Sequence, residues 1–432
     1  MAQVQLACTL NKPHLPVLKT QQLVYVYIEA KADEGIIAVR NPLNLAMVLD
    51  KSGSMEGDKI VSLRKAAKNV IGMLDKDDYV SITAFSDRVF KIAPSQAASD
   101  QSALEAVIDS IRDGGGTAMS GGIKQGLKEL EKYLSPDRVN RMLLLTDGQT
   151  FGDEDECRKL GAEMGTKDIV IQAMGLGEDW NEDLLDEVAE ASGGNADFIE
   201  TPDEITDFFQ EAVQRMQATV VQNAQLILRL VNGIVPRQVW RVTPMIENLG
   251  YRPLSDEDVQ VDLGEMDKDM GISLLVELLV SPRPEGTFRI AQAEVSYDVP
   301  VLSLVAEKSK IDIMLDFTSD PEAAKVYDAQ TMNLVEKVTA FKLQTRALRA
   351  AKMGDTEGAS KQLRAAATRL LQVGEKKLAD AAMEEAQNLE EKGEMSSAGS
   401  KKLRYATRKL TRKPRAAQEA AEGSGDQETP EA

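Results

Sequence analysis

Cysteine and histidine are scarce in this chain of 432 residues, which has two cysteines, Cys8 and Cys157, and one histidine, His14. These three side chains cannot supply a four-ligand zinc site or a framework of disulfides. A single histidine, next to Pro13 in a predicted loop, also argues against Ser-His-Asp and Cys-His catalysis. We therefore expect a protein of the reducing cytoplasm that is not an enzyme.

Long apolar runs and an excess of basic charge are also missing. The first ten residues lack the basic and apolar regions of a signal peptide, and the most apolar later segment, Ile272–Val280, is short and contains Glu277. Lys and Arg number 51 against 70 Asp and Glu, a net charge of −19, which argues against a chain that coats nucleic acid. We expect a soluble protein with no membrane span and no nucleic-acid partner.

The length and the hydrophobic pattern predict several domains, because single cores stop growing at roughly 250–300 residues. Residues 43–218 alternate short apolar runs with helical patterns, which predicts a doubly wound, Rossmann-like α/β domain with a parallel sheet. Residues 1–42 and 219–304 alternate with period two, so we expect their strands to pair in one antiparallel β-domain into which the α/β domain is inserted. The expected strands of the α/β domain are Leu45–Leu49, Tyr79–Phe85, Arg141–Thr146, Ile169–Gly175 and Ala196–Glu200.

The C-terminal quarter has a different composition. High Ala, Leu, Lys and Glu content predicts a helical bundle over residues 320–412, and residues 416–432 are typical of a disordered acidic tail. At the end of the predicted bundle, Lys401–Arg415 carries eight bases and no acid. It is a candidate for docking on an acidic partner, a membrane surface or nucleic acid, but in so acidic a chain we expect a helix that packs on the protein's own body.

Hydroxyl and carboxylate side chains follow two buried strands of the predicted sheet. The segment Asp50-Lys-Ser-Gly-Ser54 comes directly after one strand, and Asp147 directly after another; Gly114-Gly-Gly-Thr117 ends a long connection. The carboxyl ends of parallel strands share one edge, so these side chains are expected to converge there. Their oxygens suit Mg²⁺, with Mn²⁺ or Ca²⁺ as alternatives, and the predicted ligands are Asp50, Ser52, Ser54, Thr117 and Asp147.

Other chemistries fit these residues poorly. An EF-hand starting at Asp50 needs Gly and Glu where Met55 and Val61 stand. The glycine loop before Thr117 has no Gly-Lys-Ser/Thr after it, so a nucleotide site is not expected. The chain has no Gly-x-Ser-x-Gly segment for a hydrolase nucleophile, and no base is evident near the predicted metal.

The five predicted ligands match, position by position, the metal-ion-dependent adhesion site of von Willebrand factor type A domains, and the chain resembles that family over about residues 43–218. The resemblance implies that Ser52, Ser54 and Thr117 bind the ion directly, and that Asp50 and Asp147 bind it directly or through water. The whole arrangement looks like cytosolic bacterial proteins of this type, which are distantly similar to calcium-activated chloride channel regulators and inter-α-trypsin inhibitor heavy chains.

Two functions are consistent with these observations. The first is a Mg²⁺-dependent adhesion or scaffold module that binds a protein partner, whose Asp or Glu completes the metal coordination as the resemblance implies; a second copy of the chain is one such partner. The second is a structural or regulatory subunit that binds through its helical bundle, with the metal only stabilising the type A domain.

Overall fold

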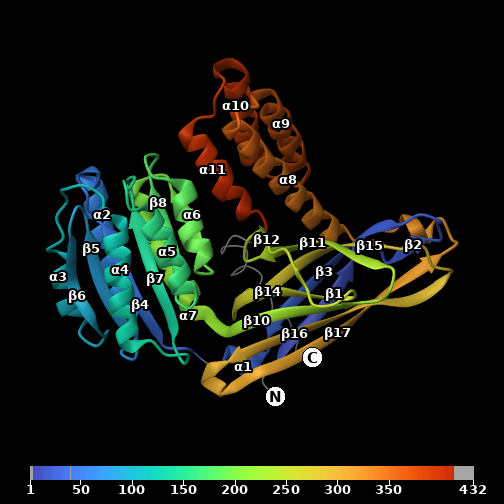
Figure 1. Cartoon of the computed structure of the whole chain (residues 1–432), viewed down its shortest axis with the longest axis horizontal. Coiled ribbons are helices and arrows are strands. Elements are labelled where there is room, and N and C mark those ends of the chain that lie inside the picture. The colour runs from blue at the N-terminus through green and yellow to red at the C-terminus, as the bar shows by residue number, and fades with distance from the viewer. Residues whose placement is uncertain (1–2, 39, 413–432) are drawn as a thin grey trace, which may run out of the picture.

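The computed structural model describes residues 3–38 and 40–412, which form three parts: an α/β domain, a β-sandwich and a helical domain (Figure 1). The predicted fold class is confirmed in each part. The expected acidic tail, 416–432, lies outside the described residues. In the part of the chain that the structure describes, no helix is both long and apolar enough to cross a membrane.

The α/β domain is built on a six-stranded sheet, here called sheet C. In spatial order its strands are β6 (Val89–Ala97), β5 (Tyr79–Phe85), β4 (Leu43–Asp50), β7 (Val139–Thr146), β8 (Val170–Leu176) and β9 (Asn195–Ile199). All eight residues of β4 and of β7 are buried, as expected for the centre of a sheet covered on both faces. These two central strands end at neighbouring positions, and both carry predicted metal ligands at or just after their ends.

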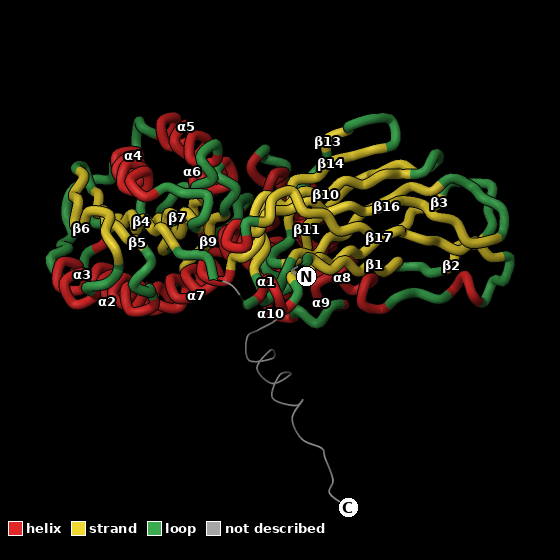
Figure 2. Tube along the Cα trace, turned by 90° about the horizontal axis from the view of Figure 1, so that it is seen from below, coloured by secondary structure: helices red, strands yellow, loops and turns green. Residues whose placement is uncertain are grey.

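Helices cover sheet C on both sides, as Figure 2 shows along the edge of the sheet. One face packs against α2 (Asp58–Met73), α3 (Gln101–Ile108) and α7 (Ile205–Ala218). The other packs against α4 (Met119–Leu130), α5 (Glu154–Gly165) and α6 (Glu182–Ala191). Short 3-10 turns lie at Gly53–Met55, Glu131–Tyr133 and Pro202–Glu204.

The sheet is not wholly parallel, because β6 runs antiparallel to β5. All five predicted strands are present, but β6 and α3 were not predicted. The connection of β5 to β6 is too short for a crossover, so the two strands form a hairpin. Most residues of β6 are exposed at the edge of the sheet, which leaves little apolar pattern to detect.

Two further sheets pack face to face as the β-sandwich. Sheet A holds β1 (Val4–Leu10), β3 (Gln22–Ala32), β15 (Ile272–Val280), β11 (Ile234–Thr243) and β12 (Glu247–Asn248). Sheet B holds β13 (Arg252–Pro253), β14 (Asp258–Asp267), β10 (Thr219–Leu230), β16 (Gly286–Val299), β17 (Leu304–Thr318) and β2 (His14–Pro16). The N-terminal strand β3 pairs along its length with β15, so the α/β domain lies between two strands of one sandwich. A four-residue helix, α1 (Glu34–Ile37), precedes β4, and a 3-10 turn at Pro300–Leu302 precedes β17.

The sandwich extends beyond residue 304, the boundary that the sequence predicts. In β17 the side chains of Ile313, Leu315 and Phe317 are buried and alternate with charged or exposed ones. This period-two pattern places β17 in sheet B and corrects the predicted boundary to Thr318. Sheet B also departs from the antiparallel prediction, because β2 pairs with β17 in parallel.

The helical domain consists of α8 (Ala329–Lys352), α9 (Thr356–Gln372), α10 (Lys376–Lys392) and α11 (Ser397–Arg408), after a 3-10 turn at Ala323–Lys325. Consecutive long helices form hairpins, and Asp355 caps α9 by accepting a hydrogen bond from the Gly358 amide. The domain contacts sheet A through Trp240, whose ring meets Phe341 edge to face.

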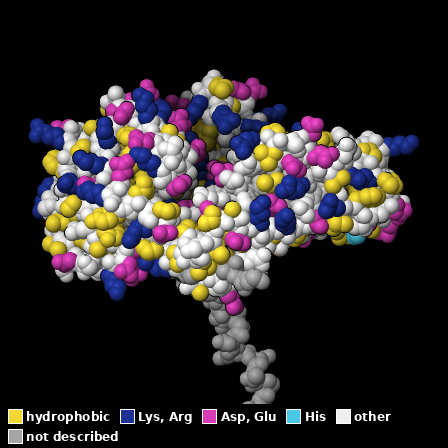
Figure 3. Space-filling view, turned by 60° about the horizontal axis from the view of Figure 1, so that its bottom comes forward, with side chains coloured by type: hydrophobic (Ala, Val, Ile, Leu, Met, Phe, Trp, Pro, Cys, Tyr) yellow, Lys and Arg dark blue, Asp and Glu magenta, His cyan; other side chains and the backbone are white. Residues whose placement is uncertain are grey.

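The basic segment that was expected to pack on the protein's own body does so within the described residues. Helix α11 carries its first part and lies against α6 of the α/β domain. Lys401 is buried, and its Nζ donates to the Trp180 carbonyl at 2.9 Å. Arg404 and Arg408 both pair with the buried Asp186, at 2.7 and 3.1 Å. Acidic and basic side chains are interspersed over the face in Figure 3.

Loss of the Asp186 charge is expected to loosen this contact. Burial raises the pKa of Asp186, while Arg408 and Arg404 lower it. The two arginines therefore favour the ionised carboxylate, which in turn is their shared counter-ion. Asp186→Asn leaves both guanidiniums without their shared partner and should lower the free energy of unfolding in urea by about 2 kcal/mol. The control Glu200→Gln breaks an exposed pair with Lys402 and should cost less than about 0.5 kcal/mol. Equal losses would show that α11 is not held through Asp186.

Candidate metal centre

Asp50, the last residue of β4, is held in one orientation. Its Oδ1 accepts from the backbone amide of Ser52 at 2.8 Å, and its Oδ2 accepts from the Thr146 hydroxyl at 2.6 Å. The side chain is fully buried, and burial raises its pKa, against the hydrogen bonds from Thr146 and Ser52. The neighbouring Asp147 raises the pKa of Asp50 further. Two carboxyl groups therefore lie close together where little water can screen them.

The two serines of the loop face Asp147, which follows β7. The Oγ atoms of Ser52 and Ser54 lie 3.0 Å apart. Both hydroxyls donate to Asp147 Oδ1, at 3.4 Å from Ser52 and 2.6 Å from Ser54. Asp147 and Ser52 are buried, whereas Ser54 is exposed. Solvent thus reaches the cluster from the side of Ser54.

Thr117 reaches the same place on a glycine loop. Gly53 donates to the carbonyl of Gly115 at 2.9 Å, and Gly114 donates to the carbonyl of Lys51 at 2.8 Å, so the two loops are bound to each other. Thr117 Oγ1 and Ser54 Oγ lie 3.4 and 3.7 Å from the point where a Cβ on Gly148 would stand. The structure thus gathers all five predicted side chains at one edge of sheet C.

The donor set fits a hard divalent cation. It combines two carboxylates with three hydroxyls, and both serine hydroxyls are placed to donate to Asp147 while their oxygen lone pairs remain for an ion. Nowhere in residues 3–38 and 40–412 do three His, Cys, Asp or Glu side chains cluster as metal ligands. An ion at this edge would therefore depend on the hydroxyls, and binding by these five residues stays a prediction.

Two residues next to the site were not predicted. Thr146 orients Asp50 by the hydrogen bond described above, and Lys59 Nζ lies 2.5 Å from Asp147 Oδ2. Thr146 precedes Asp147 directly, so its position in the chain could have drawn attention to it. Lys59 belongs to the first turn of α2, and nothing in the sequence indicates that its side chain reaches a residue 88 positions away.

Neither cysteine nor histidine takes part in the site. His14 lies in β2 of the sandwich, where its Nδ1 is 2.9 Å from Asp316. Cys8 and Cys157 are unpaired thiols, and burial raises the pKa of Cys157 to about 12. A thiol with so high a pKa is not ionised at neutral pH and is a poor nucleophile.

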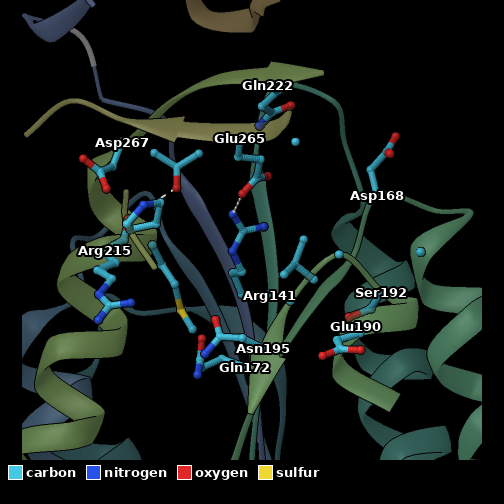
Figure 4. A pocket seen from close by; sticks show the side chains of 18 of the residues that line it. Arg141, Asp168, Gln172, Glu190, Ser192, Asn195, Arg215, Gln222, Glu265 and Asp267 are labelled. Carbon is cyan, nitrogen blue, oxygen red and sulfur yellow. Dashed lines mark hydrogen bonds and ion pairs between the residues drawn. The ribbon is translucent and has the colours of Figure 1, made fainter. Parts of the chain in front are cut away.

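A separate cleft of about 530 Å³ lies between the α/β domain and the sandwich (Figure 4). Its polar lining includes Gln172, Asn195 and Arg215, and an ion pair between Arg141 and Glu265 connects the two domains across it. The lining residues of sheet C come from the early parts of β7, β8 and β9, away from the strand ends that carry the metal-site residues. The five predicted ligands do not line this cleft.

A substitution in the glycine loop before Thr117 tests how the site is assembled. Gly115 has φ +93°, and a Cβ there would stand 2.3 Å from Asp87 Oδ1 and 2.9 Å from the hydroxyl of buried Ser86. Gly115→Ala should therefore displace the loop that carries Thr117 and weaken Mg²⁺ binding by about tenfold or more in calorimetry. Gly152→Ala is the control, because Gly152 also has positive φ but has open space around it. Unchanged Mg²⁺ affinity in Gly115→Ala would contradict the assignment of Thr117 as a ligand.

Family models match two parts of the chain. Residues 44–211 match the von Willebrand factor type A domain, and residues 329–413 match the Sll0103-like, C-terminal alpha-helical domain. Type A domains are common protein-interaction and adhesion modules, and they often bind a divalent metal at the metal-ion-dependent adhesion site.

Solved structures share the fold of nearly the whole chain. A von Willebrand factor type A protein from Catenulispora acidiphila has a TM-score of 0.74 at 16% identity, with 94% of this chain and 97% of that chain covered. The ArnB paralog VWA2 from Sulfolobus acidocaldarius has a TM-score of 0.53 at 14% identity, with the same coverage. The combination of α/β domain, sandwich and helical domain is therefore found in other proteins.

Sequence relatives extend the likeness. The inter-alpha-trypsin inhibitor heavy chain H3 of Rattus norvegicus is 26% identical over 185 residues, which cover 39% of this chain and 20% of that protein. The protein sll0103 of Synechocystis sp. is 30% identical over 355 residues, which cover 81% of this chain and 83% of that protein. With this relative and both matching domain models, the chain belongs to the sll0103 family, and it combines a von Willebrand factor type A domain with an Sll0103-like helical domain.

Proposed function

We propose that the protein is a Mg²⁺-dependent binding module that recognises an acidic side chain of a protein partner. The observation that carries this proposal is the gathering of Asp50, Asp147 and three hydroxyls at one edge of sheet C, with Ser54 exposed. Only two of the five ligands are anionic, so an octahedral ion held here would have a sixth position open to a further anionic oxygen. A partner Asp or Glu fits this position because a carboxylate is a hard ligand that neutralises charge.

The surface around the site supports docking of a protein rather than catalysis. Phe151 lies four residues after Asp147 and has 81% of its surface exposed. Its loop is anchored by Thr150, whose hydroxyl donates to the carbonyl of Thr117 at 3.1 Å. An exposed aromatic on a loop bound to that of Thr117 would add apolar contact to the charged contact made at the metal site, as at the centres of protein interfaces. Neither the imidazole of His14 nor a thiol of the described residues takes part in the site as a base, so we propose that the protein is not an enzyme.

We also propose that the protein works in the cytoplasm, where its two cysteines remain unpaired thiols. The partner supplies the acidic residue, and a second copy of the chain is one candidate. The alternative remains a structural or regulatory subunit that binds through α8–α11. The two functions differ in what the metal does, so removal of the metal separates them.

Mg²⁺ is expected to stabilise the folded protein by mass action, because it binds the native state and relieves repulsion between Asp50 and Asp147. At 100 times its Kd the ion adds about 2.7 kcal/mol. The melting temperature of the wild type should rise with Mg²⁺, and that of Asp50→Ala should not. Calorimetry on the same two proteins checks the binding directly; equal Mg²⁺ binding by both would contradict the assignment of Asp50.

Partner capture distinguishes direct recognition by the metal from stabilisation alone. Ser52→Asp adds a negative ligand, so it should retain Mg²⁺ but attract a carboxylate less. In pull-downs from the native host with saturating Mg²⁺, we expect the wild type to recover its partner and Ser52→Asp to lose it. A chelator should abolish capture by the wild type. Undiminished capture by Ser52→Asp or in chelator would show that the metal does not contact the partner and would favour the helical domain.

A further inference from the structure

Lys59 occupies one side of the metal centre. It is the second residue of α2, and its Nζ lies 2.5 Å from Asp147 Oδ2, while the hydroxyls of Ser52 and Ser54 contact Oδ1 of the same carboxylate. The side chain of Asp147 is fully buried and that of Lys59 is 30% exposed. One oxygen of Asp147 thus contacts the two serines of the predicted metal site, and the other contacts the charged amine of Lys59.

The electrostatic surroundings make this contact important. Asp50 receives hydrogen bonds from neutral donors, the Ser52 amide and the Thr146 hydroxyl. Among residues 3–38 and 40–412, the one ion pair made by either buried aspartate is that of Asp147 with Lys59. Without a metal ion, the lysine is therefore the positive charge that offsets two neighbouring carboxylates. A divalent ion that bound Asp147 would lie close to the charge of Lys59, because both would contact the same carboxylate. The lysine would therefore repel the ion.

We infer that Lys59 is an internal competitor of the metal, which neutralises Asp147 in the metal-free protein and lowers the affinity of the site for divalent cations. This inference rests on the proposed metal site and adds a residue that controls its affinity. If Lys59 remains in contact, it repels the ion; if it turns toward solvent, the ion pair is lost on binding. Both routes weaken metal binding, so loading of the site depends on the Mg²⁺ concentration.

Removal of the Lys59 charge should increase the affinity for Mg²⁺, whereas loss of a metal ligand should decrease it. In Lys59→Met, Asp147 is left buried without a counter-ion, so the metal-free protein becomes less stable and the ion gains a more negative site. Calorimetric titration of the full chain with MgCl₂ should give a Kd at least about tenfold lower than for the wild type. In EDTA the melting temperature of this variant should be lower than that of the wild type, and the rise produced by Mg²⁺ should be larger.

Three variants complete the experiment. Lys59→Arg keeps the charge and should bind Mg²⁺ within about threefold of the wild type. Lys68→Met removes a charge from the same helix, where Lys68 pairs with exposed Asp109, and should also leave the Kd within about threefold. Lys59→Gln is a second neutral variant, which gives the same test if Lys59→Met does not fold.

The outcomes separate the two claims. If the wild type binds no Mg²⁺, the proposed function fails. If the wild type binds Mg²⁺ and the neutral variants bind it equally or more weakly, the metal site stands and the role of Lys59 as a competitor is wrong. Weaker binding would instead show that Lys59 serves to orient Asp147. Tighter binding in the neutral variants but not in Lys68→Met supports the competitor.

Discussion

The proximity of two buried carboxyl groups, Asp50 and Asp147, is the constraint on which the rest of the site depends. They stand at the ends of neighbouring strands whose other residues are buried on both faces of sheet C, so the pair cannot separate without disturbing the centre of the domain. Buried like charges raise the free energy of the folded state unless positive charge or hydrogen bonds offset them. Hydrogen bonds from hydroxyl groups and the charge of Lys59 offset the two carboxylates in this structure, and a divalent ion at the same edge would do so as well.

The helical domain meets the α/β domain close to this edge. The backbone carbonyls that Lys401 contacts belong to the loop after β8, and β8 is the neighbour of β7, which leads to Asp147. Further along α11, Asp186 of α6 binds two arginines. A protein that bound at the predicted metal site would therefore lie near the junction of the type A domain and the Sll0103-like helical domain.

The sequence predicted those features that depend on local pattern. Strands β4 and β7 are continuous apolar runs followed by ligand residues, so the rule that strand ends of a parallel sheet share one edge was enough to bring Asp50 and Asp147 together. The edge strand β6 was not predicted, because most of its residues are exposed and show little alternation of apolar and polar side chains. The role of Lys59 could not be predicted, since its distance from Asp147 depends on how α2 packs on the sheet. For the same reason the charge of α11 was visible in the sequence, but its acidic partners on α6 were not.

The most direct test of a metal-dependent centre at this edge is anomalous diffraction from crystals of the full chain grown with Mn²⁺. The expected result is one anomalous peak at the ends of β4 and β7, with the hydroxyl oxygens of Ser52, Ser54 and Thr117 about 2.1 Å away and water or a neighbouring carboxylate on the exposed side. Ordered density for these five side chains with no anomalous peak among them, or a peak held by other residues, would contradict it.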